Sequence, residues 1–296
     1  MSRKHPVIAV TGSSGAGTTT VKRAFENIFR REKINAALIE GDSMHSLDRM
    51  AFRVAADEAA KAGNNTFSHF GPEANHFDKL EETFRIYGET GMCQRRFYIH
   101  SESEAKEHNQ HFDRTDLVPG TFTPWEQIEA DSDLLFYEGL HALATDGKID
   151  MAKYVDFCVG VVPVVNLEWI QKIHRDKIER GYSAEATVDT IMRRMPDYIK
   201  FIVPQFTRTD INFQRVATVD TSNPFIARDI PTLDESFVII RFKEPKGVDF
   251  PYMLNMIPNA FMSRANTLVV PGGKMSFAME IILGPILSEL IENKNK

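Results

Sequence analysis

A glycine-rich loop lies between an apolar strand and a helix near the start of the chain. The run Val7–Val10 predicts a buried strand, and a helix is predicted to begin near Thr18. Glycines in the loop let backbone N–H groups converge on phosphate oxygens, and the positive end of the helix dipole points at the same place. This arrangement predicts a phosphate-binding loop on an α/β fold. Its residues are Gly12, Ser13, Ser14, Gly15, Ala16, Gly17, Thr18, Thr19 and Thr20.

One position departs from the usual phosphate loop. A lysine normally stands between Gly17 and Thr19, and this chain has Thr18 there. Thr19 takes the hydroxyl position that usually ligates Mg²⁺. Phosphate binding is therefore predicted, and catalysis would need a cation from elsewhere in the chain. Two other interpretations stay open, namely a tight turn without a ligand and a nucleotide site without catalysis.

Two further predicted strands end in carboxylates. Ala36–Ile39 runs into Glu40, Gly41 and Asp42, and Leu134–Tyr137 runs into Glu138. In a kinase site, Mg²⁺ needs oxygen ligands and the acceptor hydroxyl needs a proton acceptor. Asp42 is thus a candidate base and Glu138 a candidate acid beside the nucleotide. The competing interpretations are a helix-capping aspartate and an ordinary strand end.

A histidine and an arginine follow Asp42 at helical spacing. If a helix begins after Asp42, His45 and Arg49 share one face of it and lie beside the carboxylate. Such a face would combine a base with a clamp for an anion.

A second source of positive charge is the predicted helix over residues 166–181, which ends at a glycine. Lys172, Arg175 and Asp176 lie within one turn of it. A helix of this kind could close over the phosphate loop as a lid and supply the missing cation. The alternative is a solvated face of ordinary ion pairs. Those pairs would be Glu168 with Lys172 and Asp176 with Arg180.

The order of predicted elements indicates one α/β domain over residues 1–296, with 43% hydrophobic residues to form its core. We expect a mixed, mostly parallel sheet flanked by helices, with an antiparallel edge. Residues 91–123 are polar and predict a hairpin or surface excursion, and residues 166–204 predict a helical lid region. The predicted strands are 7–10, 36–39, 134–137, 154–162 and 237–242.

Charge and hydropathy exclude several classes of protein. A net charge of −6 argues against a nucleic-acid partner, which would require a basic face. The most apolar late segment, 277–291, contains two glutamates and a proline and predicts a packed C-terminal helix, with no membrane association. No apolar leader precedes the first strand, so we expect a cytoplasmic protein. Its two cysteines, Cys93 and Cys158, are expected to be free thiols.

Five segments, taken together, resemble the bacterial-type phosphoribulokinases, which have the P-loop kinase fold. Single motifs among them are shared with uridine and pantothenate kinases, and the last two segments are the distinctive ones. That family also tolerates a phosphate loop without lysine. The segments are 12–20, 40–49, 136–141, 166–176 and 220–226.

The resemblance implies transfer of the ATP γ-phosphoryl group to the C1 hydroxyl of ribulose 5-phosphate, a step of carbon fixation in the Calvin cycle. Asp42 would be the general base, and Glu138 with Thr19 would serve the Mg²⁺ site. Lys172 would stabilise the transferring group, and Asp176 would support catalysis. The residues implied to hold the sugar phosphate are His45, Arg49, Arg175 and Arg180.

Regulation is implied by the same resemblance. Relatives of this type form homo-oligomers and respond to NADH as an allosteric activator, and the chain has arginines at the matching positions Arg31, Arg241 and Arg264. The competing interpretation for each arginine alone is that it forms a surface ion pair. Two rival functions stay open, a nucleoside or vitamin kinase of the same fold and a non-catalytic nucleotide sensor.

Overall fold

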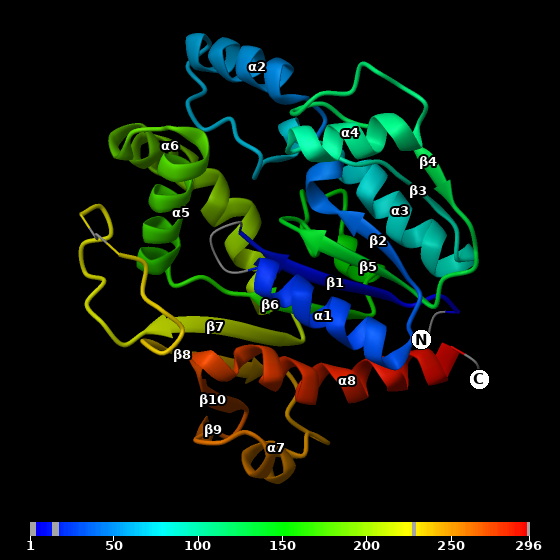
Figure 1. Cartoon of the computed structure of the whole chain (residues 1–296), viewed down its shortest axis with the longest axis vertical. Helices are drawn as coiled ribbons and strands as arrows, with labels where there is room; N and C mark the ends of the chain where they lie inside the picture. Colours follow the sequence, from blue (N-terminus) through cyan, green and yellow to red (C-terminus); the bar gives the residue numbers. More distant parts are fainter. Residues whose placement is uncertain (1–3, 14–17, 227–228, 295–296) are drawn as a thin grey trace.

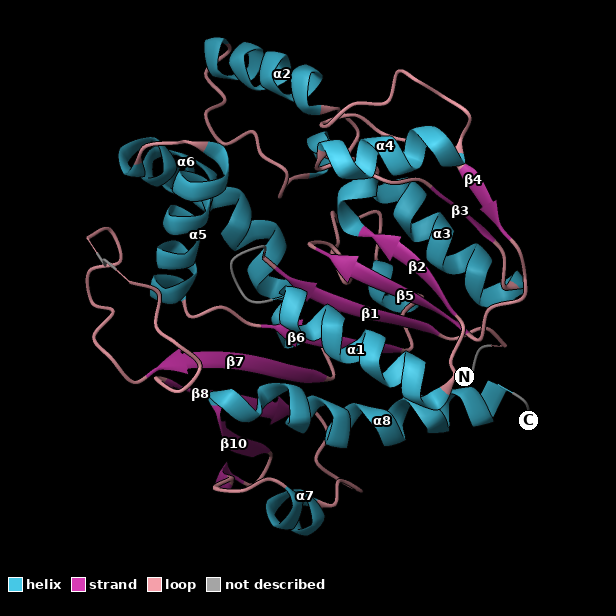
Figure 2. Ribbon diagram, in the orientation of Figure 1, coloured by secondary structure: helices cyan, strands magenta, loops and turns pink. Residues whose placement is uncertain are grey.

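A central sheet organises the chain (Figures 1 and 2). The computed structural model describes residues 4–13, 18–226 and 229–294. Within these residues the main sheet has eight strands in the order β2-β5-β1-β6-β7-β8-β10-β9. The strands are β1 (Val7–Gly12), β2 (Ala36–Glu40), β5 (Leu134–Gly139), β6 (Phe157–Val161), β7 (Ile211–Ala217), β8 (Ser236–Phe242), β9 (Phe261–Arg264) and β10 (Thr267–Pro271).

Strand direction divides the sheet into two parts. Strands β2, β5, β1, β6 and β7 run parallel, and β7, β8, β10 and β9 pair antiparallel. The mixed, mostly parallel sheet with an antiparallel edge is therefore confirmed, as are the five strands predicted from the sequence. The central parallel strands β1, β5 and β6 are buried on both faces, which is why their sequences are continuous apolar runs.

Helices cover both faces of the parallel part. On one face α1 (Thr18–Glu32) packs beside α8 (Met275–Lys294), and Phe25 of α1 lies 4.7 Å from the ring of Phe136 in β5. The other face is covered by α3 (Phe77–Thr90), whose Phe84 contacts Tyr137 edge to face. The predicted C-terminal helix is confirmed as α8. In the described part of the chain, no helix is both long and apolar enough to cross a membrane.

The segment expected as a hairpin or surface excursion has secondary structure of its own. Strand β3 (Cys93–Arg95) pairs antiparallel with β4 (Glu126–Ile128), and α4 (Glu102–His111) lies between them in the chain. A small cluster of Ile99, Ala105 and Leu117 forms its interior. Helix α2 (Arg49–Lys61) has no buried residue and projects at the top of Figure 1.

The helical region after β6 consists of α5 (Val165–Arg180) and α6 (Ala184–Asp197), followed by a π-helical turn and a 3₁₀ turn that end at Thr207. Buried Gln205 joins this region to the sheet. Its amide nitrogen donates to the carbonyls of Leu140 and Phe201, both at 2.8 Å. Its oxygen accepts from Thr11 Oγ1 in β1 at 3.2 Å and from Leu143 N at 3.0 Å. A short helix, α7 (Phe250–Met256), precedes β9.

Two glycines allow neighbouring strands to meet closely at their carboxyl ends. Glu40 of β2 is in register with Glu138 of β5, and Gly41 and Gly139 come next on each chain segment. A Cβ atom on Gly139 would lie 2.6 Å from the Gly41 Cα and 2.5 Å from the Tyr137 hydroxyl. Only glycine leaves room for this contact, so steric exclusion explains why glycine follows both Glu40 and Glu138.

We expect Gly139→Ala to lower the free energy of unfolding by about 3 kcal/mol or more, because overpacking against backbone cannot relax. The measurement is the urea midpoint at fixed protomer concentration. The matched control is Gly273→Ala, whose Cβ would meet only the end of the Asp234 side chain, at 3.1 Å. Equal midpoints for the two variants would refute the steric explanation.

Candidate active site

The carboxyl ends of the parallel strands gather the residues of the site. Strand β1 ends at Gly12, where the phosphate loop begins, and buried Ser13 donates its hydroxyl to the carboxylate of Glu168 in α5. Thr20, in the first turn of α1, is half-buried. The predicted loop residues Ser14, Gly15, Ala16 and Gly17, and the side chains of Thr18 and Thr19, lie outside the described residues.

Carboxylates flank the start of this loop. Val10 of β1 is in register with Glu138 of β5, and Glu138 is in register with Glu40 of β2. Lys22 of α1 places its Nζ 2.6 Å from Glu40 Oε1. Burial lowers the pKa of Lys22, but the hydrogen bond to Glu40 and the charges of Glu40 and Glu138 outweigh it and leave that pKa raised. Lys22 is thus a cation of the site that sequence reasoning did not select.

Asp42 lies next to these strand ends in a 3₁₀ turn, Gly41–Met44. Its side chain is 46% exposed, and its oxygens lie 3.3 Å from His45 Nε2 and 3.7 Å from His100 Nε2. Desolvation raises the pKa of Asp42, but the hydrogen bond from His45 and the charges of His45, His100 and His69 hold it below its ordinary value. The carboxylate is therefore kept ionised.

The expectation that His45 and Arg49 share one helix face is wrong. His45 ends the 3₁₀ turn, and α2 begins separately at Arg49. The reason is Asp48, whose extended backbone caps α2 and whose side chain accepts from Ala51 N at 2.8 Å. His45 is buried beside Asp42, whereas Arg49 is exposed and its side chain lies against Gly120.

Arg96, between β3 and α4, holds the segment that carries Asp42 and His45. Its Nε donates to the carbonyl of Ser43 at 2.8 Å and its Nη2 to the carbonyl of His45 at 2.6 Å. The guanidinium lies 3.8 Å from the ring centre of Phe122 and 4.7 Å from that of Trp125. Burial lowers the pKa of Arg96 to about 10, so it stays charged at neutral pH.

Sequence reasoning missed Arg96 and His100 because neither belongs to a motif. Both fall in the polar stretch 91–123, where the only signal was its polar composition, which includes three of the nine histidines of the chain.

The cationic helix α5 contains an ion-pair cluster. Lys172 Nζ lies 2.7 Å from Asp176 Oδ2, and Arg175 Nη2 lies 3.1 Å from Asp176 Oδ1. Asp176 is only 3% exposed, so it anchors the two cations and does not itself reach the solvent. Burial lowers the pKa of Lys172 more than its hydrogen bond to Asp176 raises it. The side chain of Arg180, at the end of α5, lies outside the described residues.

Glu168 does not form the ordinary ion pair that its spacing to Lys172 allowed. Its carboxylate accepts from Ser13 and from the Tyr198 hydroxyl, the latter at 3.2 Å, and burial raises the pKa of Glu168. The lid region thereby contacts Ser13 of the phosphate loop.

The lid region also contacts the segment before α3 that surrounds His45. Ser68 donates to Asp197 at 2.9 Å, and Phe70 packs against Tyr198 with ring centres 5.6 Å apart. Arg194 of α6 acts electrostatically on both Lys172 and His69. The structure therefore links the cations of α5 to the end of the site that contains Asp42.

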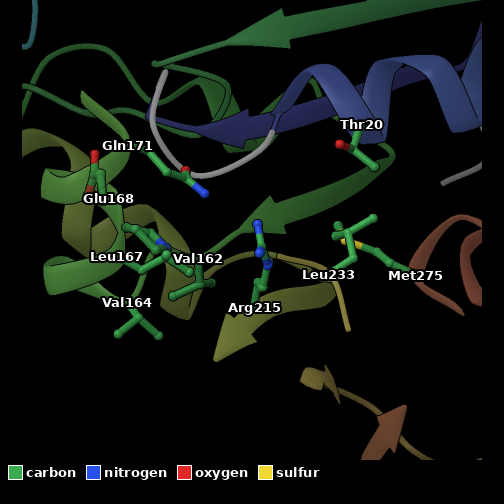
Figure 3. Close-up of a pocket in the computed structure, with 10 residues that line it drawn as sticks. Thr20, Val162, Val164, Leu167, Glu168, Gln171, Arg215, Leu233 and Met275 are labelled. Carbon is green, nitrogen blue, oxygen red and sulfur yellow. The ribbon is translucent and has the colours of Figure 1, made fainter. Parts of the chain in front are cut away.

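A pocket opens beside Thr20 between the start of α5 and strand β7 (Figure 3). Six of its ten lining residues are apolar, and the side chain of Arg215 lies between Val162 and Leu233 in Figure 3. The guanidinium of Arg215 is held by the hydroxyl of Ser236 at 3.1 Å.

The three arginines proposed for regulation lie on two sides of the sheet. Arg31, at the end of α1, pairs with Glu280 of α8 at 2.8 Å and borders a surface pocket. Arg241 and Arg264 lie on β8 and β9 and are both register partners of Thr267 in β10. Arg241 alternates with buried core residues of β8 that face α8, so it faces the opposite side of the sheet.

Comparison with known proteins places this site in a family. The sequence profile of the Phosphoribulokinase / Uridine kinase family matches residues 7–222. The phosphoribulokinase of Nitrobacter vulgaris is 57% identical over 296 residues, which cover 100% of both chains, and that of Xanthobacter flavus is 58% identical over 100% of this chain and 99% of its own. The solved phosphoribulokinase from Rhodobacter spheroides superimposes with a TM-score of 0.89 at 50% identity over 99% of both chains.

The chain belongs to the phosphoribulokinase / uridine kinase family. Membership makes it a kinase and a transferase, and it confirms the bacterial-type resemblance at the level of the family. The fold prediction is confirmed by the same comparison, since the match extends over almost the whole of a solved relative.

We expect Arg96→Met to lower kcat of this family member by about tenfold to a hundredfold, because displacing a reacting group by about 1 Å has an effect of that order. Kinase turnover at saturating substrates is the measurement. Arg95→Met is the control, because Arg95 pairs with Glu126 at 2.6 Å and does not contact the Asp42 segment. A similar loss in both variants would assign the effect to general destabilisation.

Proposed function

We propose that this chain is a phosphoribulokinase, which transfers the γ-phosphoryl group of ATP to the C1 hydroxyl of D-ribulose 5-phosphate and yields ribulose 1,5-bisphosphate for carbon fixation in the Calvin cycle. The observation that carries the proposal is the 57% identity to a phosphoribulokinase over the full length of both chains. The site supports it, because one edge of the sheet holds a phosphate loop, an ionised carboxylate and a cluster of cations.

In the proposed reaction, the oxygen of the C1 hydroxyl attacks the γ-phosphorus of ATP and ADP leaves. Asp42 accepts the proton that the hydroxyl loses. Phosphoryl transfer relies on positioning and on neutralising charge in the transition state. The lowered pKa of Asp42 keeps it in the basic form. Arg96 and His45 supply the positioning, because they hold the backbone and the carboxylate of this segment.

The remaining cations divide between the sugar phosphate and the transferring group. His45, Arg49, Arg175 and Arg180 would hold the phosphate of the acceptor. Lys172 would stabilise the transferring phosphoryl group in place of the lysine that the loop lacks. The buried Asp176 orients both Lys172 and Arg175, which gives it a supporting part in catalysis.

The nucleotide would bind along Gly12–Thr20, with its base in the pocket that Figure 3 shows beside Thr20. Glu138 and Thr19 would hold Mg²⁺ beside the phosphates of the nucleotide. The donor set fits, because Mg²⁺ prefers a few protein oxygens and takes its other ligands from phosphate and water. When bound, this ion neutralises charge on the phosphate oxygens.

Asp42→Asn is expected to lower kcat for ribulose 5-phosphate by about two to four powers of ten with little change in ATP binding, as for loss of a general base. ADP release is measured against pentose phosphates and nucleosides. Asp48→Asn is the matched control, because it removes a nearby carboxylate and keeps the cap of α2.

Near-normal turnover of Asp42→Asn would remove Asp42 from the role of base. Preference for a nucleoside in the parent enzyme would favour the rival kinase function, and ATP binding without turnover of any acceptor would favour the sensor.

For regulation we propose a homo-oligomer that NADH activates through Arg31, Arg241 and Arg264. Arginine suits a pyrophosphate because its planar fork makes paired hydrogen bonds to phosphate oxygens. The opposite placement of Arg31 and Arg241 on the sheet favours a site completed by a second protomer. The face that contains Arg241 also exposes Phe237 and Phe261, at 39% and 49%, and suits a protein contact.

We expect Arg241→Ala to abolish activation by NADH while the fully active rate stays reachable, because an effector must bind the active state more tightly. Activity is measured with and without NADH, and the exposed Lys246→Ala is the control. A variant that responds like its parent, or a parent that ignores NADH, would refute the effector site.

A further inference from the structure

The ring of His45 lies between two polar neighbours. Its Nδ1 is 2.7 Å from the side-chain oxygen of Asn75, and its Nε2 is 3.3 Å from Asp42 Oδ1. Both His45 and Asn75 are buried, with exposed fractions of 6% and 7%. The position of the ring protons therefore depends on what these two neighbours accept or donate.

The orientation of the Asn75 amide follows from its other contacts. Its NH₂ group donates to the carbonyls of His69, at 2.9 Å, and Gly71, at 2.7 Å. A flipped amide would set its oxygen against both carbonyl oxygens, which are acceptors only. The oxygen must consequently face His45. A β-bridge between His45 and Asn75 keeps the two side chains in register.

An amide oxygen can only accept, so the ring nitrogen that faces it must carry a proton. We propose that Asn75 is a positioning residue that keeps the proton of neutral His45 on Nδ1, so that Nε2 donates a hydrogen bond only when the ring is a cation. The neutral ring presents a lone pair to the Asp42 carboxylate, and the cation presents an N–H donor.

The consequence for the reaction rests on the proposed function, in which His45 also meets the phosphate of ribulose 5-phosphate. A neutral ring would turn a lone pair toward that anion and repel it. A cationic ring would donate Nε2–H and contribute its charge. Binding of the acceptor therefore requires the second proton on His45. Asn75 disfavours the neutral tautomer protonated on Nε2, which could donate to the phosphate without that proton.

Several titratable groups surround His45, and two of the histidines stay neutral near neutral pH. Burial lowers the pKa of His69 well below its ordinary value and that of His141 to about 3. Arg194 lies near His69 and adds to that lowering. His100 is the other imidazole beside Asp42 and has to be controlled for. The groups around His45 are Asp42, His69, Tyr98, His100 and His141.

The first test is direct and needs no substrate. Nitrogen-15 NMR of histidine-labelled enzyme, with His45 assigned by its loss in His45→Gln, reports which ring nitrogen is protonated. We expect neutral His45 of the parent to carry its proton on Nδ1, and Asn75→Ala to populate both tautomers. A parent with the proton on Nε2 overturns the proposal, whether or not the enzyme phosphorylates ribulose 5-phosphate.

The second test is the pH profile of kcat/KM for ribulose 5-phosphate. In the parent, this parameter should be highest where the ring is a cation, because only the cation donates from Nε2. In Asn75→Ala it should be about five- to tenfold lower at the plateau, as for loss of one hydrogen bond, with a shallower fall because the neutral Nε2–H tautomer still donates. The KM for ATP should stay within about twofold of the parent.

Matched variants separate positioning from stability. Asn109→Ala also removes an asparagine that bridges backbone groups, those of Leu117 at 2.9 and 3.1 Å, but it does not contact His45. Its profile should keep the parent's shape. The same comparison in a His100→Gln background excludes His100 as the titrating group. Identical profiles for the two asparagine variants would overturn the proposal, and the parent NMR spectrum decides it if Asn75→Ala does not fold.

Discussion

The parallel register of β2, β5, β1 and β6 is the constraint on which the site depends. Hydrogen bonds between these strands bring Gly12, Glu138 and Gly41 to one edge of the sheet, although they lie far apart in the chain. Parallel strands end on the same side, so a phosphate loop and two carboxylates meet there without a dedicated element to carry them. The contact between Gly41 and Gly139 sets how closely the two acidic segments approach. Helices α1, α8 and α3 then bury both faces and make this geometry rigid.

Buried polar side chains convert this edge into a positioned site. Gln205 uses both its amide hydrogens and its oxygen to join β1, the loop after β5 and the end of the lid region. Arg96 holds the backbone around His45, and Asn75 holds its ring. Each of these groups is costly to bury without partners and stabilises one arrangement when its partners are present. The hydrogen bonds of these buried polar groups therefore fix the positions of the site residues more closely than apolar packing alone would.

In the proposed reaction, helix α5 supplies the cation that the phosphate loop lacks. Lys172 and Arg175 share the buried carboxylate of Asp176, and this keeps two cations on one face of the helix despite their repulsion. Because the lid region also contacts Ser13 through Glu168, its position is coupled to that of the loop.

The sequence alone indicated five of the eight strands of the main sheet, a phosphate loop after the first of them and the acidic strand ends, because apolar periodicity and glycine placement report local burial and backbone freedom. It also indicated Lys172, Arg175 and Asp176, whose spacing along one helix is itself local. Only the tertiary structure decided that His45 and Arg49 belong to separate elements. It also decided that Arg96, His100 and Asn75 lie around the segment that contains Asp42. The hydrogen bonds from His45 to Asn75 and from Arg96 to His45 span 30 and 51 residues, and that from Thr11 to Gln205 spans 194. Partners at such separations leave no periodic trace in the sequence, because a single side chain finds them only after the chain has folded.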